Sequence, residues 1–228
     1  MATIQQLIPQ QKRLLRKTVS AGLSLISSNG IEVQSHKITE RIRALPVFKS
    51  SQGVCCYLSM PSGEVSTASI VSAILKSEKR LFVPKMLNKK EGMMDCFEIY
   101  GEEDLASLLS GQWGIKEPET SWNGTPRTHA LQDDNELLDL ILLPAVAYDR
   151  SFSRLGHGKG YYDRFIASYS ANDRHRPVLV GLSLREQLLG SGAIPMSDHD
   201  WRMDMIITPD EVLIRAESDV KERESSSS

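Results

Sequence analysis

Apolar residues follow two spacings along this chain, one typical of helices and one typical of buried strands. From Pro9 they recur at helical spacing, and the pattern predicts a first helix that ends at Asn29-Gly30. Helical spacing returns over residues 35–45, again after a serine-threonine cap at residues 66–67, and over Tyr161–Tyr169. Short apolar runs between polar segments predict strands. These strands are expected at residues 53–60, 80–84, 94–100, 137–144, 177–184 and 203–209.

The alternation of helices and strands predicts an α/β fold. We expect a single three-layer domain over residues 1–216, with a mostly parallel sheet and helices on both faces. The last residues, 217–228, are polar and low in complexity, so we expect a disordered tail there. The polar segment 117–135 contains two prolines and is expected to be a flexible loop.

The charge balance limits the classes of partner. The chain has 27 basic and 29 acidic residues and a formal net charge of -2, so no broad cationic surface for nucleic acid is predicted. Its most apolar stretch, residues 140–148, is too short to span a bilayer and contains Pro144. We therefore expect neither nucleic acid nor a membrane as a partner. A monomer is also expected.

Cysteine usage indicates a reducing compartment. Cys55 and Cys56 are adjacent in a predicted strand, where their side chains would point to opposite faces, and they lack metal-site spacing. Both are expected in the core, and a cytoplasmic location is expected. An alternative stays open, because four basic residues and no acidic one precede Glu32. That composition is also typical of a mitochondrial presequence.

The most unusual segment is glycine-rich and lies between a strand and a helix. Residues 154–163 read RLGHGKGYYD. Glycines allow a backbone to approach a ligand closely, and N–H groups at a helix start attract anions. Ligands of open α/β sheets bind at the carboxyl ends of strands, which is where this segment falls. No serine or threonine follows Lys159, so this is not the common P-loop. The pattern alone fits an anion-binding loop and a flexible surface loop equally well.

A longer stretch around this segment resembles a known family. Residues 142–165, LLPAVAYDRSFSRLGHGKGYYDRF, are similar to the signature of 5-formyltetrahydrofolate cyclo-ligases, also called methenyltetrahydrofolate synthetases, and weaker similarity extends from about Lys12 to Asp200. The resemblance implies ATP-dependent cyclisation of 5-formyltetrahydrofolate to 5,10-methenyltetrahydrofolate, with release of ADP and phosphate. It also implies Mg²⁺ as cofactor and ATP as co-substrate. In that mechanism the formyl oxygen attacks the γ-phosphorus, and the 10-nitrogen then closes the ring.

The resemblance also assigns site residues. It implies that Lys159 and Arg154 are catalytic and that Asp163 and Asp200 hold the metal. The ATP-binding residues it implies are Lys12, Arg16, Arg154, Gly156, Gly158, Lys159, Gly160, Tyr161 and Tyr162. The substrate-binding residues it implies are Met60, Glu64, Ser66, Trp113, His157, Gly158, Lys159, Gly160 and Tyr161.

Two positions depart from the family. Phe152 stands where the family has glycine, which predicts a turn of different shape, and Ser66 stands where relatives often carry an acid. The second departure puts recognition of the pterin by a carboxylate in doubt, or moves it to Glu64.

Several assigned residues also have a plain structural interpretation. Lys12 and Arg16 share one helix face, and such a pair is commonly a solvated basic surface. Asp163 is equally suited to the first turn of a helix, and Asp200 to a turn. Trp113 is equally suited to the core.

The N-terminal helix has two opposed interpretations. It can be a targeting peptide or a solvated arm, but its apolar stripe also allows it to fold onto the domain. We expect the second arrangement, which would carry Lys12 and Arg16 to the ATP phosphates. Two other functions stay open for the whole chain: another α/β enzyme acting on a phosphorylated or CoA substrate, and a non-catalytic folate- or nucleotide-binding protein.

Overall fold

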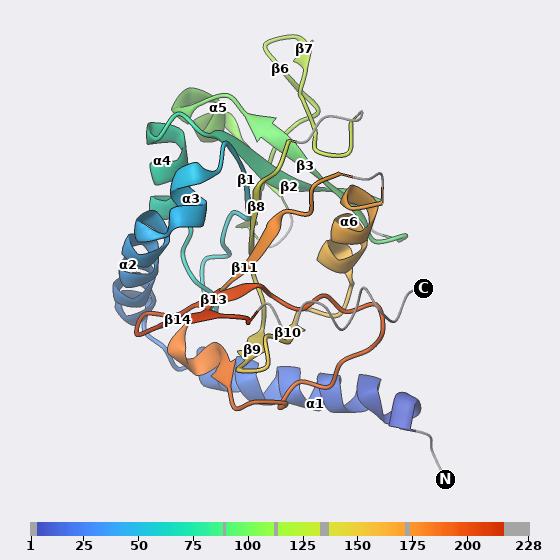
Figure 1. The fold of residues 1–228 in the computed structure, drawn as a ribbon. Coiled ribbons are helices and arrows are strands. Elements are labelled where there is room, and N and C mark those ends of the chain that lie inside the picture. The colour runs from blue at the N-terminus through green and yellow to red at the C-terminus, as the bar shows by residue number, and fades with distance from the viewer. Residues whose placement is uncertain (1–3, 89, 112–113, 133–136, 172–173, 217–228) are drawn as a thin grey trace.

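A seven-stranded sheet forms the middle layer of the protein (Figure 1). The computed structural model describes residues 4–88, 90–111, 114–132, 137–171 and 174–216. The strands lie in the order β14-β13-β11-β8-β1-β2-β3, and only the edge strands β3 and β14 run antiparallel to their neighbours. The strand bounds are β1 Gly53–Cys56, β2 Arg80–Asn88, β3 Met93–Ile99, β8 Leu140–Leu143, β11 Val178–Leu182, β13 Met205–Ile207 and β14 Val212–Ile214. The predicted mostly parallel α/β sheet is confirmed.

Helices cover both faces of this sheet (Figure 1). Helices α2 (Ser28–Ala44) and α4 (Ala68–Lys76) bury their apolar stripes on one face, and α6 (Tyr161–Tyr169) buries its stripe on the other. Cys56 belongs to the first of these cores and Cys55 to the second, because successive strand residues point to opposite faces. Both cysteines are buried and free, as expected.

Smaller elements connect these layers. A second sheet has the order β10-β9-β12 and lies close to α1 in Figure 1. The remaining bounds are α1 Ile4–Leu23, α3 Pro46–Ser50, α5 Glu102–Ser107, β4 Leu109–Ser110, β5 Lys116–Glu117, β6 Ser121–Trp122, β7 Thr125–Pro126, β9 Ala147–Asp149, β10 Arg154–Leu155, η2 Arg185–Gln187 and β12 Leu188–Leu189. No helix among the described residues is long and apolar enough to cross a membrane.

The first helix was predicted with wrong limits. Helix α1 ends at Leu23, and Asn29 and Gly30 belong to the first turn of α2. The Ser27 hydroxyl accepts a hydrogen bond from the Gly30 N–H at 3.1 Å, so this serine starts a new helix where Asn-Gly had predicted a stop. Pro9 lies inside α1 and not in its first turn.

The helix nevertheless folds onto the domain. Val19 and Leu23 are buried in the main core, and Leu15 and Ile26 pack against that core. This packing agrees with the expected arrangement of the N-terminal helix.

Strand limits also differ from the predictions. Strand β1 ends at Cys56, four residues earlier than expected, whereas β2 continues to Asn88. Strand β2 continues through Pro84 because its pairing with β1 has already ended there, at the pair of Cys55 and Phe82. Beyond that pair, β2 has a partner only in β3, so a proline is tolerated.

The segment expected to be a loop contains short β-hairpin strands. Strands β6 and β7 flank an Asn123-Gly124 turn in which both residues have positive φ, 48° and 78°. Asn-Gly is the preferred sequence for such a turn, and this signal was missed. Arg127 anchors the hairpin through an ion pair to Asp104, with both side chains 1% exposed. Residues 133–136 and the predicted tail at 217–228 lie outside the described residues.

Candidate functional site

The glycine loop, residues 156–160, lies between β10 and α6 at the carboxyl edge of the parallel strands. Gly158 and Gly160 have φ of 92° and 65°, in the region that favours glycine. Gly160 is also the N-cap of α6, so the N–H groups of the first helical turn follow the loop directly. A loop of this shape next to a helix start suits an anion.

The turn before the loop is held by a buried aspartate. The Asp149 carboxylate accepts hydrogen bonds from the N–H groups of Ser151 and Ser153, each at 3.0 Å. Phe152 lies between them with φ of 63°. This is a conformation for which glycine is suited, so the Phe152 side chain is accommodated in a glycine-type backbone. The expectation of a differently shaped turn gains no support from this geometry.

Helix α1 brings two cations to the loop. The Arg16 Nε donates to the Gly156 carbonyl at 2.7 Å, and a Cβ at Gly158 would lie 3.3 Å from the Arg16 guanidinium. The Lys12 ammonium pairs with the Asp200 carboxylate, which also accepts from the Ser197 N–H at 2.6 Å. Burial acts to raise the pKa of Asp200, but the hydrogen bonds from Lys12 and Ser197 outweigh it and leave this pKa lowered.

A second ion pair lies under the loop. Arg154 donates to the Asp163 carboxylate at 2.8 Å, and its guanidinium lies 5.5 Å from the centre of the Tyr162 ring. The other Asp163 oxygen accepts from the Trp201 N–H at 3.2 Å. Since Trp201 follows Asp200 directly, this hydrogen bond brings together the segments that carry the two predicted metal ligands, which are 37 positions apart in the sequence.

Lys159 differs from the other cations of the loop. Its side chain is exposed, and its ammonium makes no hydrogen bond or ion pair within the described part of the chain. His157 is exposed as well, but desolvation by the loop and then the charges of Arg16 and Arg154 lower its pKa. Tyr161 and Tyr162 are half-buried and pack against the core beneath α6.

Two of the predicted substrate residues after β1 are joined by a hydrogen bond. Glu64 is 5% exposed, and its carboxylate accepts from the Met60 N–H at 2.6 Å. Burial raises the pKa of Glu64 to about 7, and the Met60 hydrogen bond opposes this rise. The Glu64 charge also acts to raise the pKa of Tyr148 and of Tyr162, for which burial is the larger cause.

The two remaining substrate predictions have different outcomes. The Ser66 N–H donates to the Ser35 hydroxyl at 2.9 Å, which ties this residue to α2. Trp113 lies outside the described residues.

Comparison with known proteins decides the family. The sequence pattern of the 5-formyltetrahydrofolate cyclo-ligase family matches residues 8–209. This chain belongs to that family. A probable 5-formyltetrahydrofolate cyclo-ligase of Schizosaccharomyces pombe is 35% identical over 208 residues, covering 89% of this chain and 97% of that protein. A mitochondrial 5-formyltetrahydrofolate cyclo-ligase of Arabidopsis thaliana is also 35% identical, covering 90% of this chain and 76% of that protein.

A solved structure shares the fold. The 5,10-methenyltetrahydrofolate synthetase of Aquifex aeolicus superposes with a TM-score of 0.69 at 29% identity, covering 89% of this chain and 92% of that one. Membership of this cyclo-ligase family makes the chain a ligase that acts on small molecules.

The carboxylates of this candidate site fit magnesium only together with a phosphate ligand. Among the described residues no cluster of three or more histidine, cysteine, aspartate or glutamate side chains is arranged to hold a metal. Asp163 and Asp200 supply two carboxylates, and each is already paired with a cation. Magnesium normally takes one or two protein carboxylates and completes its shell with phosphate oxygens and water. The pair therefore suits magnesium that arrives with a nucleotide.

Two residues of the site were missed from the sequence. Asp149 shapes the turn before the loop, and Arg164 donates hydrogen bonds to the Lys159 and Gly92 carbonyls. Both stand in the family-like stretch that the sequence singled out. A signal for Asp149 was its place before Arg150-Ser151, since aspartate commonly caps such turns. No sequence signal joined Arg164 to Gly92.

Proposed function

We propose that this protein catalyses the ATP-dependent cyclisation of 5-formyltetrahydrofolate to 5,10-methenyltetrahydrofolate, with release of ADP and phosphate. The observation that carries the proposal is a group of four basic side chains at and beside one glycine loop in a member of this family. Lys159 belongs to the loop, and Arg16 donates to the Gly156 carbonyl. Arg154 and Lys12 pair with the neighbouring carboxylates of Asp163 and Asp200. Phosphoryl transfer asks a protein mainly for positioning and for charge stabilisation, which such a set supplies.

Each part of the site has a proposed role toward ATP. The Gly156, Gly158 and Gly160 backbone and the start of α6 receive phosphate oxygens, and Tyr161 and Tyr162 border them. Lys159 is the exposed cation that stabilises charge on the transferring phosphoryl group, with Arg154 beneath it. The Lys12 and Arg16 side chains reach the same phosphates from α1.

Binding of ATP would change the partners of two of these cations. Lys12 and Arg154 now neutralise Asp200 and Asp163, so phosphate oxygens would compete with those carboxylates for them. A carboxylate released in this way is free to hold a cation, and we propose Asp163 and Asp200 as the residues that would hold magnesium. When bound, magnesium supplies positive charge to the phosphates.

The chemistry itself uses no nucleophile from the protein. The formyl oxygen of the substrate attacks the γ-phosphorus, and the bond to ADP breaks. The 10-nitrogen then attacks the activated carbon and gives up its proton, and phosphate leaves as the carbon–oxygen bond breaks and the ring closes. The role of the chain is to hold these atoms in line and to exclude water. Cys55, Cys56 and Cys96 are buried and lie in the core.

The folate is proposed to lie against the loop after β1. Met60 and Glu64 border it there, with Ser66, Trp113, His157 and Tyr161 as further contacts. Since Ser66 carries no charge, Glu64 is left as the carboxylate that recognises the pterin. Its pKa of about 7 allows it to be a proton donor or an acceptor near neutral pH.

Assembly and location are two further parts of the proposal. We propose a monomer, which sedimentation would test. We also propose a cytoplasmic location, because the cysteines are buried and form no disulfide, as is usual in a reducing compartment. The Arabidopsis relative is named as mitochondrial, so imaging of the tagged protein should distinguish these two compartments.

A single assay tests the proposed reaction. Purified protein is mixed with Mg²⁺, ATP and 5-formyltetrahydrofolate, and both ADP and the near-ultraviolet absorbance of the methenyl product are followed. We expect one ADP for each product and no ADP without the folate. ATP consumption that ignores the folate would indicate another α/β enzyme, and binding of both ligands without product would indicate a non-catalytic binding protein.

A further inference from the structure

Arg164 joins two segments that are far apart in the sequence. It lies in the first turn of α6, and its Nε donates to the Gly92 carbonyl at 3.0 Å. A terminal nitrogen of the same guanidinium donates to the Lys159 carbonyl. Gly92 belongs to the connection between β2 and β3, and α6 packs against β3 (Figure 1). One side chain therefore bridges the glycine loop and the β2–β3 hairpin.

Two glycines make space for this bridge. A Cβ at Gly92 would lie 1.8 Å from an Arg164 terminal nitrogen and 2.7 Å from its Cζ. A Cβ at Gly160 would lie 3.0 Å from the other terminal nitrogen. Both glycines also have positive φ, 67° and 65°. The absence of a Cβ at Gly92 and at Gly160 therefore leaves room for the Arg164 guanidinium between these two backbone segments.

The bridge acts on the residue that matters most for the proposed reaction. The Lys159 carbonyl is fixed by Arg164, whereas the Lys159 side chain is exposed and has no partner in the described part of the chain. A long, flexible lysine side chain places its ammonium group accurately only if its backbone is fixed. The Nε and one terminal nitrogen of Arg164 already donate to carbonyl groups of the protein, so these two donors hold the backbone.

We propose that Arg164 is a positioning residue, which fixes the glycine loop to the β2–β3 hairpin so that Lys159 and the loop N–H groups face the ATP phosphates. This inference rests on the proposed function for its kinetic consequence but not for its structural one. It identifies the β2–β3 hairpin as a support of the nucleotide site.

Kinetics test the consequence. Arg164→Ala should raise KM for Mg-ATP roughly ten- to a hundredfold, because misplacement of a binding loop by about 1 Å has effects of that size. The matched control is Arg150→Ala, which removes an exposed arginine paired with Glu211 and should leave KM unchanged. An unchanged KM for Mg-ATP in folded Arg164→Ala protein would overturn the proposal.

A double-variant cycle separates the bridge from general destabilisation. Gly92→Ala should also raise KM for Mg-ATP, because its methyl group would displace the guanidinium. In an Arg164→Ala background the same change should add little, since the clash is gone. Gly124→Ala is the matched control for backbone strain, because Gly124 has φ of 78° and open space around it. Fully additive effects of the two changes would contradict a shared bridge.

Hydrogen exchange of the ligand-free protein tests the bridge without any reaction. In Arg164→Ala, amides 156–160 should exchange faster, while those in the second half of α6 and in β8 keep wild-type rates. Wild-type exchange in the loop would defeat the proposal even if cyclisation is observed. Faster loop exchange would support it even if the wild-type protein fails to form the methenyl product, so the two proposals can fail separately.

Discussion

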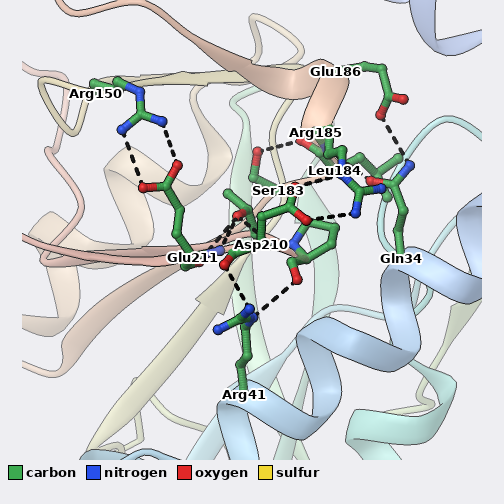
Figure 2. A network of polar contacts seen from close by, with 11 residues as sticks. Gln34, Arg41, Arg150, Ser183, Leu184, Arg185, Glu186, Asp210 and Glu211 are labelled. Carbon is green, nitrogen blue, oxygen red and sulfur yellow. Dashed lines mark hydrogen bonds and ion pairs between the residues drawn. The ribbon is translucent and has the colours of Figure 1, made fainter.

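Two groups of charged side chains lie at the carboxyl edge of the sheet, and they differ in exposure. At the glycine loop, Arg154 and Asp163 are 5% and 16% exposed, and Lys12 and Asp200 are 12% and 13% exposed. The Arg185 cluster, shown in Figure 2, lies after β11 and β13. Its main pairs are Arg185 with Asp210, 44% and 54% exposed, and Arg150 with Glu211, 47% and 40% exposed.

The partners of the two groups differ as well. Arg185 makes two hydrogen bonds to the Asp210 carboxylate, at 2.6 and 2.7 Å, and Gln34 and Arg41 of α2 donate to Glu186 and to the Asp210 carbonyl (Figure 2). These contacts attach α2 to the edge of the sheet. At the glycine loop, by contrast, Lys159 has no such partner among the described residues.

This difference in exposure and partners indicates which charged side chains stabilise the fold and which are available to bind a ligand. Exposed pairs contribute little to stability, because water solvates their ions well in either state. Nearly buried pairs suffer a desolvation penalty, and losing one partner leaves an uncompensated charge. We infer that the glycine-loop pairs hold cations ready for an anion, whereas the Arg185 cluster fastens a helix. The predictions below test this contrast.

Lys159→Ala should have the largest effect. Removal of the exposed cation should lower turnover by roughly 10³-fold or more, as loss of a charge-stabilising residue does in phosphoryl transfer. The free energy of unfolding should change by less than about 0.5 kcal/mol, because the side chain is exposed and has no partner among the residues that the structure describes. Lys76→Ala is the matched control, since Lys76 is an exposed lysine at the end of α4. Near-normal turnover in folded Lys159→Ala protein would remove the phosphate role.

Asp163→Ala should affect both stability and magnesium dependence. It leaves the nearly buried Arg154 without its carboxylate, so we expect a loss of about 3 kcal/mol in denaturant unfolding. The variant should also need more magnesium for half-maximal activity. If the magnesium titration is unchanged, Asp163 serves only as the partner of Arg154 at the helix start.

Glu64→Gln should change how stability depends on pH. The folded pKa of about 7 lies above the ordinary value of 4.5, so the folded protein holds the proton more strongly than the unfolded chain. The favourable contribution is complete below about pH 4.5 and is lost as the pH rises through 7. Across that range the wild type should lose roughly 3 kcal/mol relative to Glu64→Gln. If the free energies of unfolding of the two proteins change in parallel as the pH rises from 4.5 through about 7, Glu64 is not a buried group that binds a proton on folding.

Arg185→Ala should have the smallest effect. Its exposed pair with Asp210 is expected to contribute little to stability, and less at high salt. Turnover should stay at the wild-type value, because the cluster is assigned a structural role. A large fall in turnover at wild-type stability would show that the functional charge extends beyond the glycine loop.

The sequence predicted the sheet well because its strands are short apolar runs. Residues 140–143 are buried on both faces, so all four are apolar. Such a run can be recognised as a strand without knowing which strands lie beside it. Helix limits were harder to predict. Ser27 is a start signal for a helix and Asn29-Gly30 is a stop signal, and the two lie next to each other. The packing of α2 on the core decides between them. The Asn123-Gly124 hairpin was a local signal that could have been used.

The glycine loop could be predicted as a site from its composition, but its charge pairs could not. The pairing of Lys12 with Asp200 joins residues 188 positions apart, and no local pattern states which acid a given lysine meets. The bridge from Arg164 to Gly92 is of the same kind, because it depends on how α6 lies against β3. Pairings of this kind follow from tertiary packing.

Hydrogen exchange with and without Mg-ATP tests the central contrast most directly. We expect ATP to protect amides in residues 9–17 of α1 and in residues 154–163, because phosphates would fix the loop and the cations above it. Amides 183–187 and 208–211 of the Arg185 cluster should be unaffected. Protection of the Arg185 cluster without protection of the glycine loop would contradict the account.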